Sequence, residues 1–408
     1  MDCTSNKDAT TASSSGGKPT LLLCMTPRMS IEGWYRTGIA ERELAPYREY
    51  VRRGWRVVVL DFGDRWTAPF EGISTANVRW FARFHFPVPL VSRCMRLLSL
   101  CLLPLLSGRH FRCARVVKTN QSHLSWFYVL AARLWRRSIL LRCGYVYGKN
   151  LEMSHGRKLK TRLYQLLEGW AFRNATVCQV TTDELARWVT QRYGVPPERL
   201  HVVPNFVNEV FFGVRWQARH PAVPVRVLSV GRLVTEKRFD LLIQAAALLK
   251  PCEVTIVGQG SLRASLIAQA RDRGVDLRLP GNIPNEQLPQ VMLQHDVFVC
   301  TSRWEGHPKA LTEAMAAGMP CIGTHAPGVS NLIDHGRTGL LVEASADAVA
   351  DAVRRITRDQ ECAQRLGSGA RDEMRRKCSF EPLFEREYQK VVEILSGCEG
   401  SVKCRGLA

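Results

Sequence analysis

The stretch "DVFVCTSRWEGHPKALTEAMAAGMP", residues 296–320, decides the fold. It opens with an apolar run that is typical of a buried strand, passes through a charged loop, and resumes as a helix that we expect over residues 309–317. In α/β proteins, ligands bind where the parallel strands end and the next helices begin. Glu305 and Glu313 stand at such a point. The pattern therefore predicts an α/β sheet with a ligand site at its edge.

The rest of the chain repeats this alternation of strand and helix. Strands recur about every 25–30 residues with helices between them, which predicts βαβ units and parallel sheets. With 408 residues the chain is long enough for two cores. The segment 204–224 contains prolines and shows no clear period. We therefore expect two doubly wound domains, over 20–205 and 206–379, a disordered tail over 1–19, and first-domain helices over 38–53, 124–136, 158–173 and 184–193.

The charge of the chain is strongly asymmetric. Of the formal net charge of +20, +17 falls between residues 21 and 180. Such a region attracts phosphates, nucleic acid or an anionic membrane. The apolar window 88–108 is interrupted by charges and a proline, which argues against a membrane span. We expect a buried helix, or a helix that lies on a membrane surface with arginines at the headgroups. The arginines concerned are Arg93, Arg96, Arg109, Arg112, Arg133, Arg136 and Arg137.

The 14 cysteines do not form a disulfide framework. They are scattered, several lie within apolar runs, and none forms a CxxC pair. Thiols buried as small apolar groups in a reducing compartment explain them best, and the spacing of a zinc site is missing. We therefore expect a cytoplasmic protein without a bound metal.

Four strand ends in the second half carry groups that suit a phosphorylated ligand. Glycines let the backbone approach a ligand, and Arg232 and Lys237 offer a fork and a point charge for a diphosphate. The helix that starts near Pro308 directs free N–H groups at the same space. Glu313 can accept hydrogen bonds from the two hydroxyls of a ribose, and Glu305 can hold a hydroxyl beyond the phosphates. Each feature alone also fits an ordinary surface or turn residue. Together they predict a site formed by Gly231, Arg232, Lys237, Gly258, Gly260, Gly281, Glu305, Gly306, His307, Pro308, Lys309, Ala310, Leu311 and Glu313.

Several of these motifs resemble a known family. The segments "VGRLVTEKRFDLLIQA", "TIVGQGSLR", "HDVFVCTSRWEGHPKALTEAMAAGMPCIGT" and "LIDHGRTGLLV" are similar to the retaining nucleotide-sugar glycosyltransferases of family 4, which have the GT-B fold. The two glutamates separated by seven residues are the signature of that family. The resemblance is strong over residues 200–345 and is closest to bacterial members that assemble polysaccharides. It implies two Rossmann-like domains that face each other across a cleft, and a last helix over 380–396 that crosses back onto the first domain before a flexible tail over 397–408.

The resemblance also implies roles for the candidate residues. Arg232 and Lys237 would hold the donor diphosphate, Glu313 the ribose, and Glu305 a sugar hydroxyl, while the backbone of residues 307–311 would cradle the distal phosphate and the sugar. His307 stands where the family often has an aromatic residue. The first loop of the front domain, "TPRMSIEGWYRTG", lacks the glycine pair that the family often has there.

A second cluster lies in residues 116–145, between a predicted strand and the strand that follows it. Asn120, Gln121 and His123 are expected to face the cleft, and His123 would bind the transferred sugar or the acceptor, or merely cap a helix. Arg142 would bind an acceptor phosphate or form a structural ion pair. The predicted catalytic set is therefore Arg232, Lys237, Glu305 and His123, and the predicted acceptor set is Asn120, Gln121, His123 and Arg142.

These observations predict a retaining, metal-independent glycosyltransferase that needs no cofactor. It would move a sugar from a nucleotide-diphosphate sugar, UDP rather than GDP, to a hydroxyl of a glycan or a lipid-linked saccharide. The alternatives are a sugar-nucleotide epimerase of the same fold, which needs no acceptor, and a basic nucleic-acid-binding protein. We expect no nucleic-acid partner, because the basic half shows no recognisable binding motif. The basic region instead predicts peripheral contact with the inner face of an anionic membrane.

Overall fold

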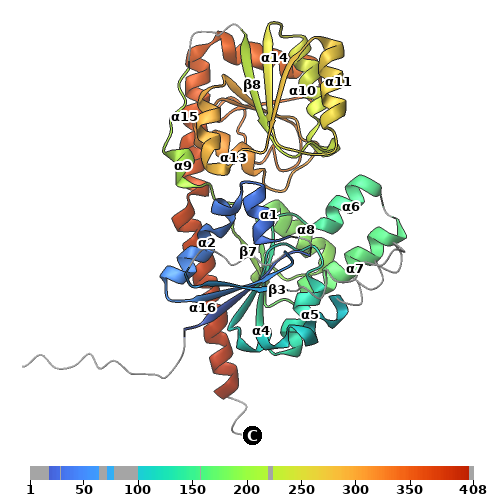
Figure 1. Cartoon of the computed structure of the whole chain (residues 1–408), viewed down its shortest axis with the longest axis vertical. Helices are drawn as coiled ribbons and strands as arrows, with labels where there is room; N and C mark the ends of the chain where they lie inside the picture. Colours follow the sequence, from blue (N-terminus) through green and yellow to red (C-terminus); the bar gives the residue numbers. More distant parts are fainter. Residues whose placement is uncertain are drawn as a thin grey trace, which may run out of the picture.

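The computed structural model describes residues 18–27, 29–63, 71–77, 100–156, 158–218 and 224–403. Two α/β domains lie one above the other (Figure 1). The first is built on a seven-stranded parallel sheet in the order β3-β2-β1-β4-β5-β6-β7. The order reverses between β1 and β4, as in doubly wound folds. The strands are β1 (Thr20–Cys24), β2 (Arg56–Asp61), β3 (Ile73–Asn77), β4 (Val116–Thr119), β5 (Ser138–Cys143), β6 (Val177–Val180) and β7 (Leu200–Val202).

The second domain has a six-stranded parallel sheet in the order β10-β9-β8-β11-β12-β13. Here the order reverses between β8 and β11, so a crevice is expected at the carboxyl ends of these two strands. The near-continuous apolar strands are buried because helices cover both faces. The strands are β8 (Val225–Val230), β9 (Cys252–Val257), β10 (Asp276–Gly281), β11 (Val297–Cys300), β12 (Cys321–Thr324) and β13 (Leu340–Val342).

Helices cover the two faces of the first sheet separately. The face with Leu21 and Val57 packs against one helix group, and the face with Leu22 and Val117 packs against another. This division follows from the alternation of side chains along each strand. The first group is α1 (Ile31–Arg36), α2 (Ala40–Arg52) and α16 (Phe380–Lys403); the second is α4 (Gly108–Cys113), α5 (Trp126–Leu134), α7 (Leu159–Asn174) and α8 (Asp183–Tyr193), with α6 (Tyr147–His155) beside α7.

A single core holds the second domain together. Apolar residues at helical spacing explain its helices, and Ser345 caps α14 by accepting a hydrogen bond from the Ala348 N–H. The helices are α9 (Glu209–Phe212), α10 (Phe239–Ala247), α11 (Arg263–Arg273), α12 (Leu288–Leu293), α13 (Lys309–Ala316), α14 (Ala346–Arg358) and α15 (Gln360–Cys378). Short 3-10 turns are η2 (Pro197–Arg199), η3 (Thr235–Lys237) and η4 (Asn285–Gln287).

The last helix, α16, leaves the second domain after α15 and runs along the first (Figure 1). Phe384, Val391 and Ile394 are buried in the core of the first domain. Arg53 lies over the rings of Phe384 and Tyr388, with its guanidinium carbon 4.9 and 4.5 Å from their centroids. The crossing helix is therefore a structural part of the first domain.

Some local expectations were wrong. The helix expected over 38–53 begins at Ala40, because Gly38 has φ +73° and interrupts it, and the separate α1 precedes it. The edge strand β3 and the helices α6 and α9 were not expected, since each is short and lacks a clear period. Helix α16 extends to Lys403, so the part of the expected flexible tail that the structure describes is helical. Arg93 and Arg96, and all of window 88–108 before residue 100, lie outside the described residues.

Candidate functional site

The predicted glycines form the floor of the candidate donor site. Gly231 follows β8, Gly258 and Gly260 follow β9, and Gly281 is the last residue of β10. The backbones of these loops lie in close contact. Gly258 has φ +142°, and a Cβ atom there would lie 2.0 Å from the carbonyl oxygen of Gly231. A Cβ atom on Gly260 would lie 2.3 Å from the carbonyl oxygen of Leu233, and the Gly258 N–H donates to the Gly281 carbonyl at 2.8 Å. These positions admit only glycine because the loops touch backbone to backbone.

Lys237 and Glu305 meet above this floor. The Lys237 ammonium and the Glu305 carboxylate form an ion pair, and the Ser302 hydroxyl donates to the same Oε1 of Glu305 at 2.7 Å. Their side chains are 22% and 16% exposed, so both are accessible to a ligand. A small cavity here is lined by both residues and by Pro308 and Leu311 at the start of α13. The structure thus brings together the groups predicted for the diphosphate and for the sugar.

Arg232 is exposed, and its guanidinium makes no hydrogen bond to the residues that the structure describes, although its backbone carbonyl accepts one from the Val234 N–H at 2.9 Å. It lies near Tyr145 of the first domain. Burial raises the pKa of Tyr145, and the charge of Arg232 opposes that rise. Arg232 is therefore a cation that faces the opposite domain and is available to a ligand between the two.

The loop before α13 contacts the first domain directly. A Cβ atom on Gly306 would lie 2.4 Å from the carbonyl oxygen of Gly144, at the end of β5. The Glu305 N–H donates to the Pro327 carbonyl at 2.9 Å, and Gly328 packs against the Glu305 carbonyl. This loop is held from both domains, which fixes the position of Glu305.

His307 is buried, with 9% of its surface exposed. Its carbonyl accepts a hydrogen bond from Asn205 Nδ2 at 3.1 Å, but its own Nδ1 has no hydrogen-bond partner among the described residues. Burial, together with the smaller effect of the nearby Lys309 charge, lowers the pKa of His307 to about 4. At neutral pH the imidazole is therefore uncharged.

Glu313 is held by residues that the sequence analysis missed. Its Oε1 accepts hydrogen bonds from Arg42 Nη1 of the first domain at 2.7 Å and from Asn285 Nδ2 at 2.9 Å. Arg42 also pairs with Glu43 at 3.2 Å, and Glu43 pairs with Lys309 at the start of α13. Burial alone would raise the pKa of Glu43, but Lys309 and Arg42 hold it well below its usual range. Nothing in the local sequence indicates this network, because its members are brought together only by the docking of two domains.

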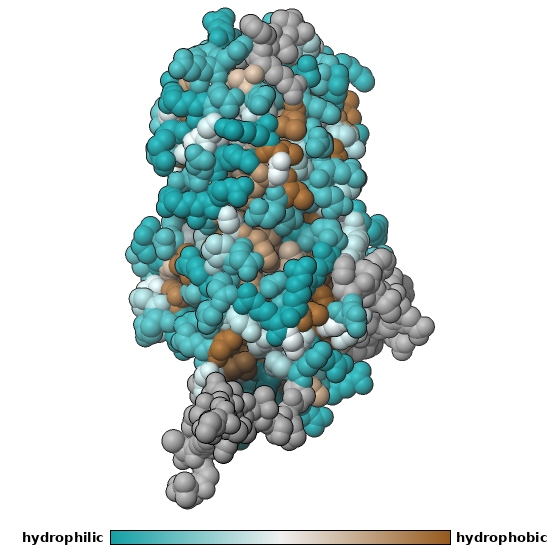
Figure 2. All heavy atoms as spheres, turned by 90° about the vertical axis from the view of Figure 1, so that its left-hand side faces the viewer, coloured by the Kyte–Doolittle hydropathy of each residue, from teal (hydrophilic) through white to brown (hydrophobic). Residues whose placement is uncertain are grey.

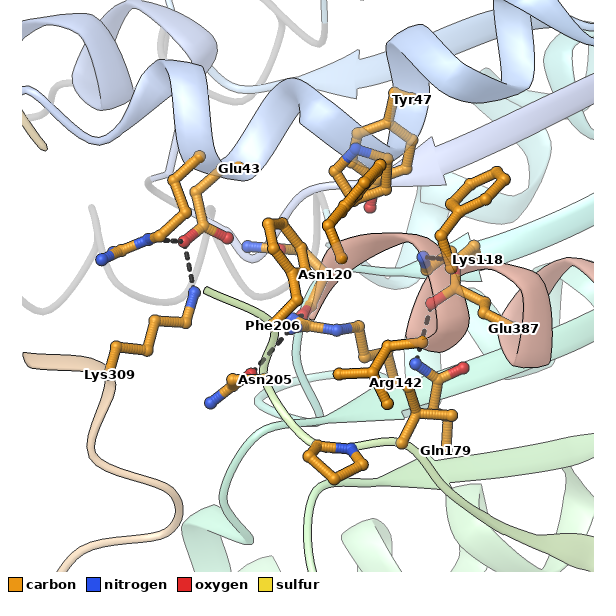
Figure 3. Close-up of a pocket in the computed structure, with 17 residues that line it drawn as sticks. Glu43, Tyr47, Lys118, Asn120, Arg142, Gln179, Asn205, Phe206, Lys309 and Glu387 are labelled. Atoms are coloured by element: carbon orange, nitrogen blue, oxygen red, sulfur yellow. Dashed lines mark hydrogen bonds and ion pairs between the residues drawn. The ribbon is translucent and has the colours of Figure 1, made fainter. Parts of the chain in front are cut away.

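Two predicted acceptor residues line a larger pocket at the junction of the domains (Figure 3). Asn120 and Arg142 lie at its centre, and Arg142 donates to the Asn120 carbonyl and to Asn205 Oδ1, both at 3.2 Å. Lys118 forms a buried ion pair with Glu387 of α16. The pocket encloses about 590 Å³, part of it open to solvent, and its walls are Arg42, Glu43, Pro46, Tyr47, Gln179, Val203, Pro204, Phe206, Lys309, Phe380, Leu383 and Phe384, in addition to these residues.

Gln121 and His123 do not line that pocket. The side-chain Oε1 of Gln121 accepts a hydrogen bond from the Gly144 N–H at 2.9 Å. His123 Nδ1 lies 2.8 Å from the Tyr164 hydroxyl of α7, and its ring lies against Tyr147 with centroids 4.2 Å apart. The four acceptor candidates therefore fall into two pairs, one at the domain junction and one beside α6 and α7.

Beneath the second pair lies Glu168, a buried carboxylate that the sequence analysis did not single out and that holds the loop of Gln121 and His123 through Ser122. It accepts hydrogen bonds from Ser122, Tyr193 and the backbone N–H groups of Tyr147 and Gly148 at 2.7–3.1 Å. Burial raises the pKa of Glu168 to about 7, although these hydrogen bonds oppose the rise. The carboxylate joins the loop that carries His123 to the start of α6.

The described residues include no group of three or more His, Cys, Asp or Glu side chains placed to hold a metal ion. Among the same residues, no helix has both the length and the apolar character that crossing a membrane requires.

Two family models match the chain, one for each domain. The model described as "Glycosyl transferases group 1" matches residues 214–373, and the model described as "Glycosyl transferase 4-like domain" matches residues 37–205. Together they cover every strand of the two sheets except β1. The chain belongs to the glycosyltransferases of the GT-B fold. The region matched by the first model contains every predicted donor residue of this chain, and the region matched by the second contains all four acceptor candidates.

Known proteins resemble this glycosyltransferase over different lengths. The amylovoran biosynthesis glycosyltransferase AmsK of Erwinia amylovora is 32% identical over 181 residues, which cover 41% of this chain and 44% of AmsK. Sucrose-phosphate synthase of Thermosynechococcus elongatus superposes with a TM-score of 0.74 at 19% identity and covers 93% of this chain and 100% of its own. Anabaena HepE in complex with UDP-glucose gives a TM-score of 0.70 at 18% identity, over 93% and 99% of the two chains. This chain spans less than two thirds of the length of the first curated relatives that it matches.

Proposed function

We propose that this protein transfers a sugar from a nucleotide-diphosphate sugar to a hydroxyl of a glycan or a lipid-linked saccharide, with retention of configuration, in polysaccharide or glycoconjugate biosynthesis. One observation carries the proposal. Lys237, Glu305 and the start of α13 line one cavity above the interlocked glycines. The loop that carries Glu305 contacts both domains. UDP is favoured as the nucleotide, in keeping with the UDP-glucose bound by the structural neighbour HepE.

The donor would lie between the domains. Lys237 and Arg232 would neutralise the diphosphate, together with the free N–H groups of α13. Oε1 of Glu313 is occupied by Arg42 and Asn285, whereas its Oε2 makes no hydrogen bond to the described residues. That second oxygen would accept the ribose hydroxyls. The carboxylate would then be held on one side by the protein and on the other by the donor.

Same-face substitution is the mechanism that this arrangement favours. A double displacement needs a carboxylate that is free to attack the anomeric carbon. Glu305 Oε1 already has two donors, Lys237 and Ser302, which lower its nucleophilicity. Glu305 would instead hold a sugar hydroxyl, while Lys237 and Arg232 stabilise the departing diphosphate. A phosphate oxygen of the leaving group would take the proton from the acceptor, and the charge of the two cations makes metal independence the expectation.

The acceptor would approach from the first domain. The loop with His123 and the loop with Gly144 are joined by Gln121, and Gly144 touches Gly306 beside Glu305. An acceptor hydroxyl that enters along these loops reaches the predicted sugar position. Because one ring nitrogen of His123 is hydrogen-bonded to the Tyr164 hydroxyl, its ring is fixed in place, and we assign His123 to positioning the acceptor. The uncharged imidazole of His307 has an unpaired nitrogen next to Glu305, so we assign it to a hydroxyl of the donor sugar.

Thermal stabilisation by a panel of UDP-, GDP-, TDP- and CMP-sugars, with and without EDTA, tests the donor site. We expect one nucleotide to raise the melting temperature, and the shift to persist in EDTA. It should be lost in Lys237→Met and kept in Lys250→Met, an exposed lysine at the opposite end of the sheet. If no nucleotide sugar stabilises the wild type, the donor assignment is wrong.

The stereochemical outcome needs its own experiment. With the donor and acceptor that the panel identifies, NMR of the product gives the anomeric configuration of the transferred sugar. We expect retention of configuration, so an α-linked donor should give an α-linked product. A β-linked product would reject same-face substitution while leaving the donor site intact.

A further inference from the structure

Helix α7 of the first domain has polar side chains on its buried side and leucines on its exposed side, the reverse of what a helix that faces water usually shows. It buries the polar side chains of Thr161, Gln165 and Glu168. Its opposite side exposes Leu159, Leu163 and Leu166, which are 84%, 59% and 66% exposed. Their spacing of four and three residues places them along one stripe. An exposed leucine is ordinary, but a stripe of leucines outside and polar groups inside indicates a partner that is not water.

Neighbouring helices continue this surface. Helix α5 packs against α7 and α4, and Trp135 Nε1 donates to the Pro104 carbonyl at 2.7 Å, which ties the helical residues 100–106 to α5. Helices α4, α5 and α7 lie together at the lower right of Figure 1. We call the combined surface the leucine face. Its exposed members are Leu102, Leu105, Leu106, Leu130, Leu134, Leu159, Leu163 and Leu166.

The exposed charged side chains of α4, α5 and α7 are all basic. From residue 72 to residue 151 the sequence contains no Asp or Glu. The acid nearest along α7, Glu168, is buried and hydrogen-bonded inward. Exposed cations stand between and beside the leucines: Arg109, Arg112, Arg115, Arg133, Arg136, Lys158, Lys160 and Arg162.

A different face of the molecule gives the contrast. Figure 2 shows the side that carries α15, α16 and α2, which is mainly hydrophilic with small, separated apolar patches. Leu248 and Ile267 of the second domain are exposed as well, but neither belongs to a leucine stripe. Most of the exposed large apolar side chains among the described residues therefore lie on or beside the leucine face.

We propose that the leucine face docks on an anionic lipid membrane, with the leucines in the headgroup–acyl boundary and the arginines and lysines at the lipid phosphates. Mixed apolar and basic surfaces bind membranes in this way. Nucleic acid would satisfy the cations but leave the leucines in water. A second copy of the chain would bury the leucines but set these cations against the same cations of its partner. A bilayer with anionic lipids suits both kinds of side chain.

The orientation has a consequence for the acceptor. Tyr164 lies on the inner side of α7 and contacts His123, so only one helix separates the leucine face from the acceptor loop. Docking would bring that loop close to the bilayer. An acceptor carried on a lipid phosphate would then reach the site without leaving the membrane.

Vesicle flotation with the full chain tests the proposal. We expect the protein to float with phosphatidylcholine vesicles that contain phosphatidylglycerol, and not with phosphatidylcholine alone. The variant Leu159→Ser, Leu163→Ser, Leu166→Ser should bind at least tenfold more weakly, because its changes are exposed and remove only the stripe. Leu248→Ser with Ile267→Ser is the matched control and should float like the wild type.

Three results would overturn the proposal. The wild type fails to float with anionic vesicles at low salt, the triple variant floats as well as the wild type, or sedimentation shows a wild-type dimer that the triple variant converts to a monomer. The last result would assign the leucine face to a second copy. The increase in melting temperature caused by a nucleotide sugar is measured on the same variants and should be unchanged. The experiment therefore tests the membrane proposal independently of the proposed donor site.

Discussion

Replacing Arg42 with methionine tests the connection between the domains. Arg42 belongs to α2 of the first domain, and its partner Glu313 lies on α13 of the second. Their side chains are 12% and 3% exposed, so the loss leaves a buried carboxylate without its cation. Breaking a buried ion pair costs about 3–5 kcal/mol. Asn285 still donates to Glu313, which retains part of the stabilisation. We therefore expect the free energy of unfolding to fall by about 3 kcal/mol, measured by urea titration with circular dichroism.

Arg48→Met on the same helix is the control. Arg48 pairs with Glu41 at 2.6 Å, but these side chains are 26% and 41% exposed. A pair with that exposure contributes about 1 kcal/mol at most. In a double-mutant cycle, Glu313→Gln should remove much of the penalty of Arg42→Met, because the buried charge is gone, and the coupling should be about 2 kcal/mol. If Arg42→Met costs no more than Arg48→Met, the cross-domain pair does not hold the domains together.

Three further predictions concern the donor side of the molecule. Gly258→Ala should abolish stabilisation by nucleotide sugars, because a Cβ atom would collide with the Gly231 carbonyl, whereas Gly336→Ala, at φ +78° in open space, should keep it in the same thermal-shift assay. The lowered pKa of His307 means that the folded state binds fewer protons than the unfolded state between about pH 6.5 and pH 4, so the free energy of unfolding falls as the pH drops through that range. In urea titrations at these two pH values, His307→Phe should lose about 3 kcal/mol less than the wild type between them. The same loss in both proteins would contradict this prediction. Because the pKa of Glu43 is lower in the folded than in the unfolded state, its ionised carboxylate stabilises the fold at neutral pH. Glu43→Gln should therefore have a lower free energy of unfolding than the wild type at neutral pH. In acid unfolding below about pH 4.5, where the carboxylate begins to be protonated in the unfolded state, the difference in free energy between the two proteins should shrink.

Sequence reasoning predicted the elements with strong periods. The strand and helix around Glu305 and Glu313 lie where the apolar run and the helical spacing placed them, as β11 and α13. The glycines after β8, β9 and β10 were also found, because a glycine at a strand end has a physical meaning that the sequence alone conveys. Short elements such as α1, β3 and α6 were missed, since their few residues carry no period that distinguishes them from loops.

The parts of the site that were missed share a different cause. Arg42 and Asn285 reach Glu313 from positions 271 and 28 residues away along the chain. Glu387 reaches Lys118 from the last helix, 269 residues away. A single sequence does not indicate such pairs, because the Arg42 pair is made by the docking of the two domains and the other pairs are made by the packing of distant elements within a domain. The exposed leucines of α7 were missed for a related reason: apolar residues at helical spacing normally indicate the buried side, and here that side is polar.

The cross-domain contacts bear on how the donor site works. Glu313 stands in the second domain, yet one of the two groups that orient it, Arg42, comes from the first. Glu305 likewise lies in a loop whose Gly306 rests on Gly144 of the first domain. A domain movement that separates these contacts would take Arg42 away from Glu313 and remove the first-domain support of the loop that carries Glu305, although the hydrogen bonds from the second domain to both carboxylates would remain. If the donor binds Glu305 and Glu313 as proposed, it would bind best where both supports are in place and would favour the closed arrangement by its differential affinity for the two states. Closure would then exclude water from the diphosphate and limit hydrolysis of the donor before an acceptor hydroxyl is in place.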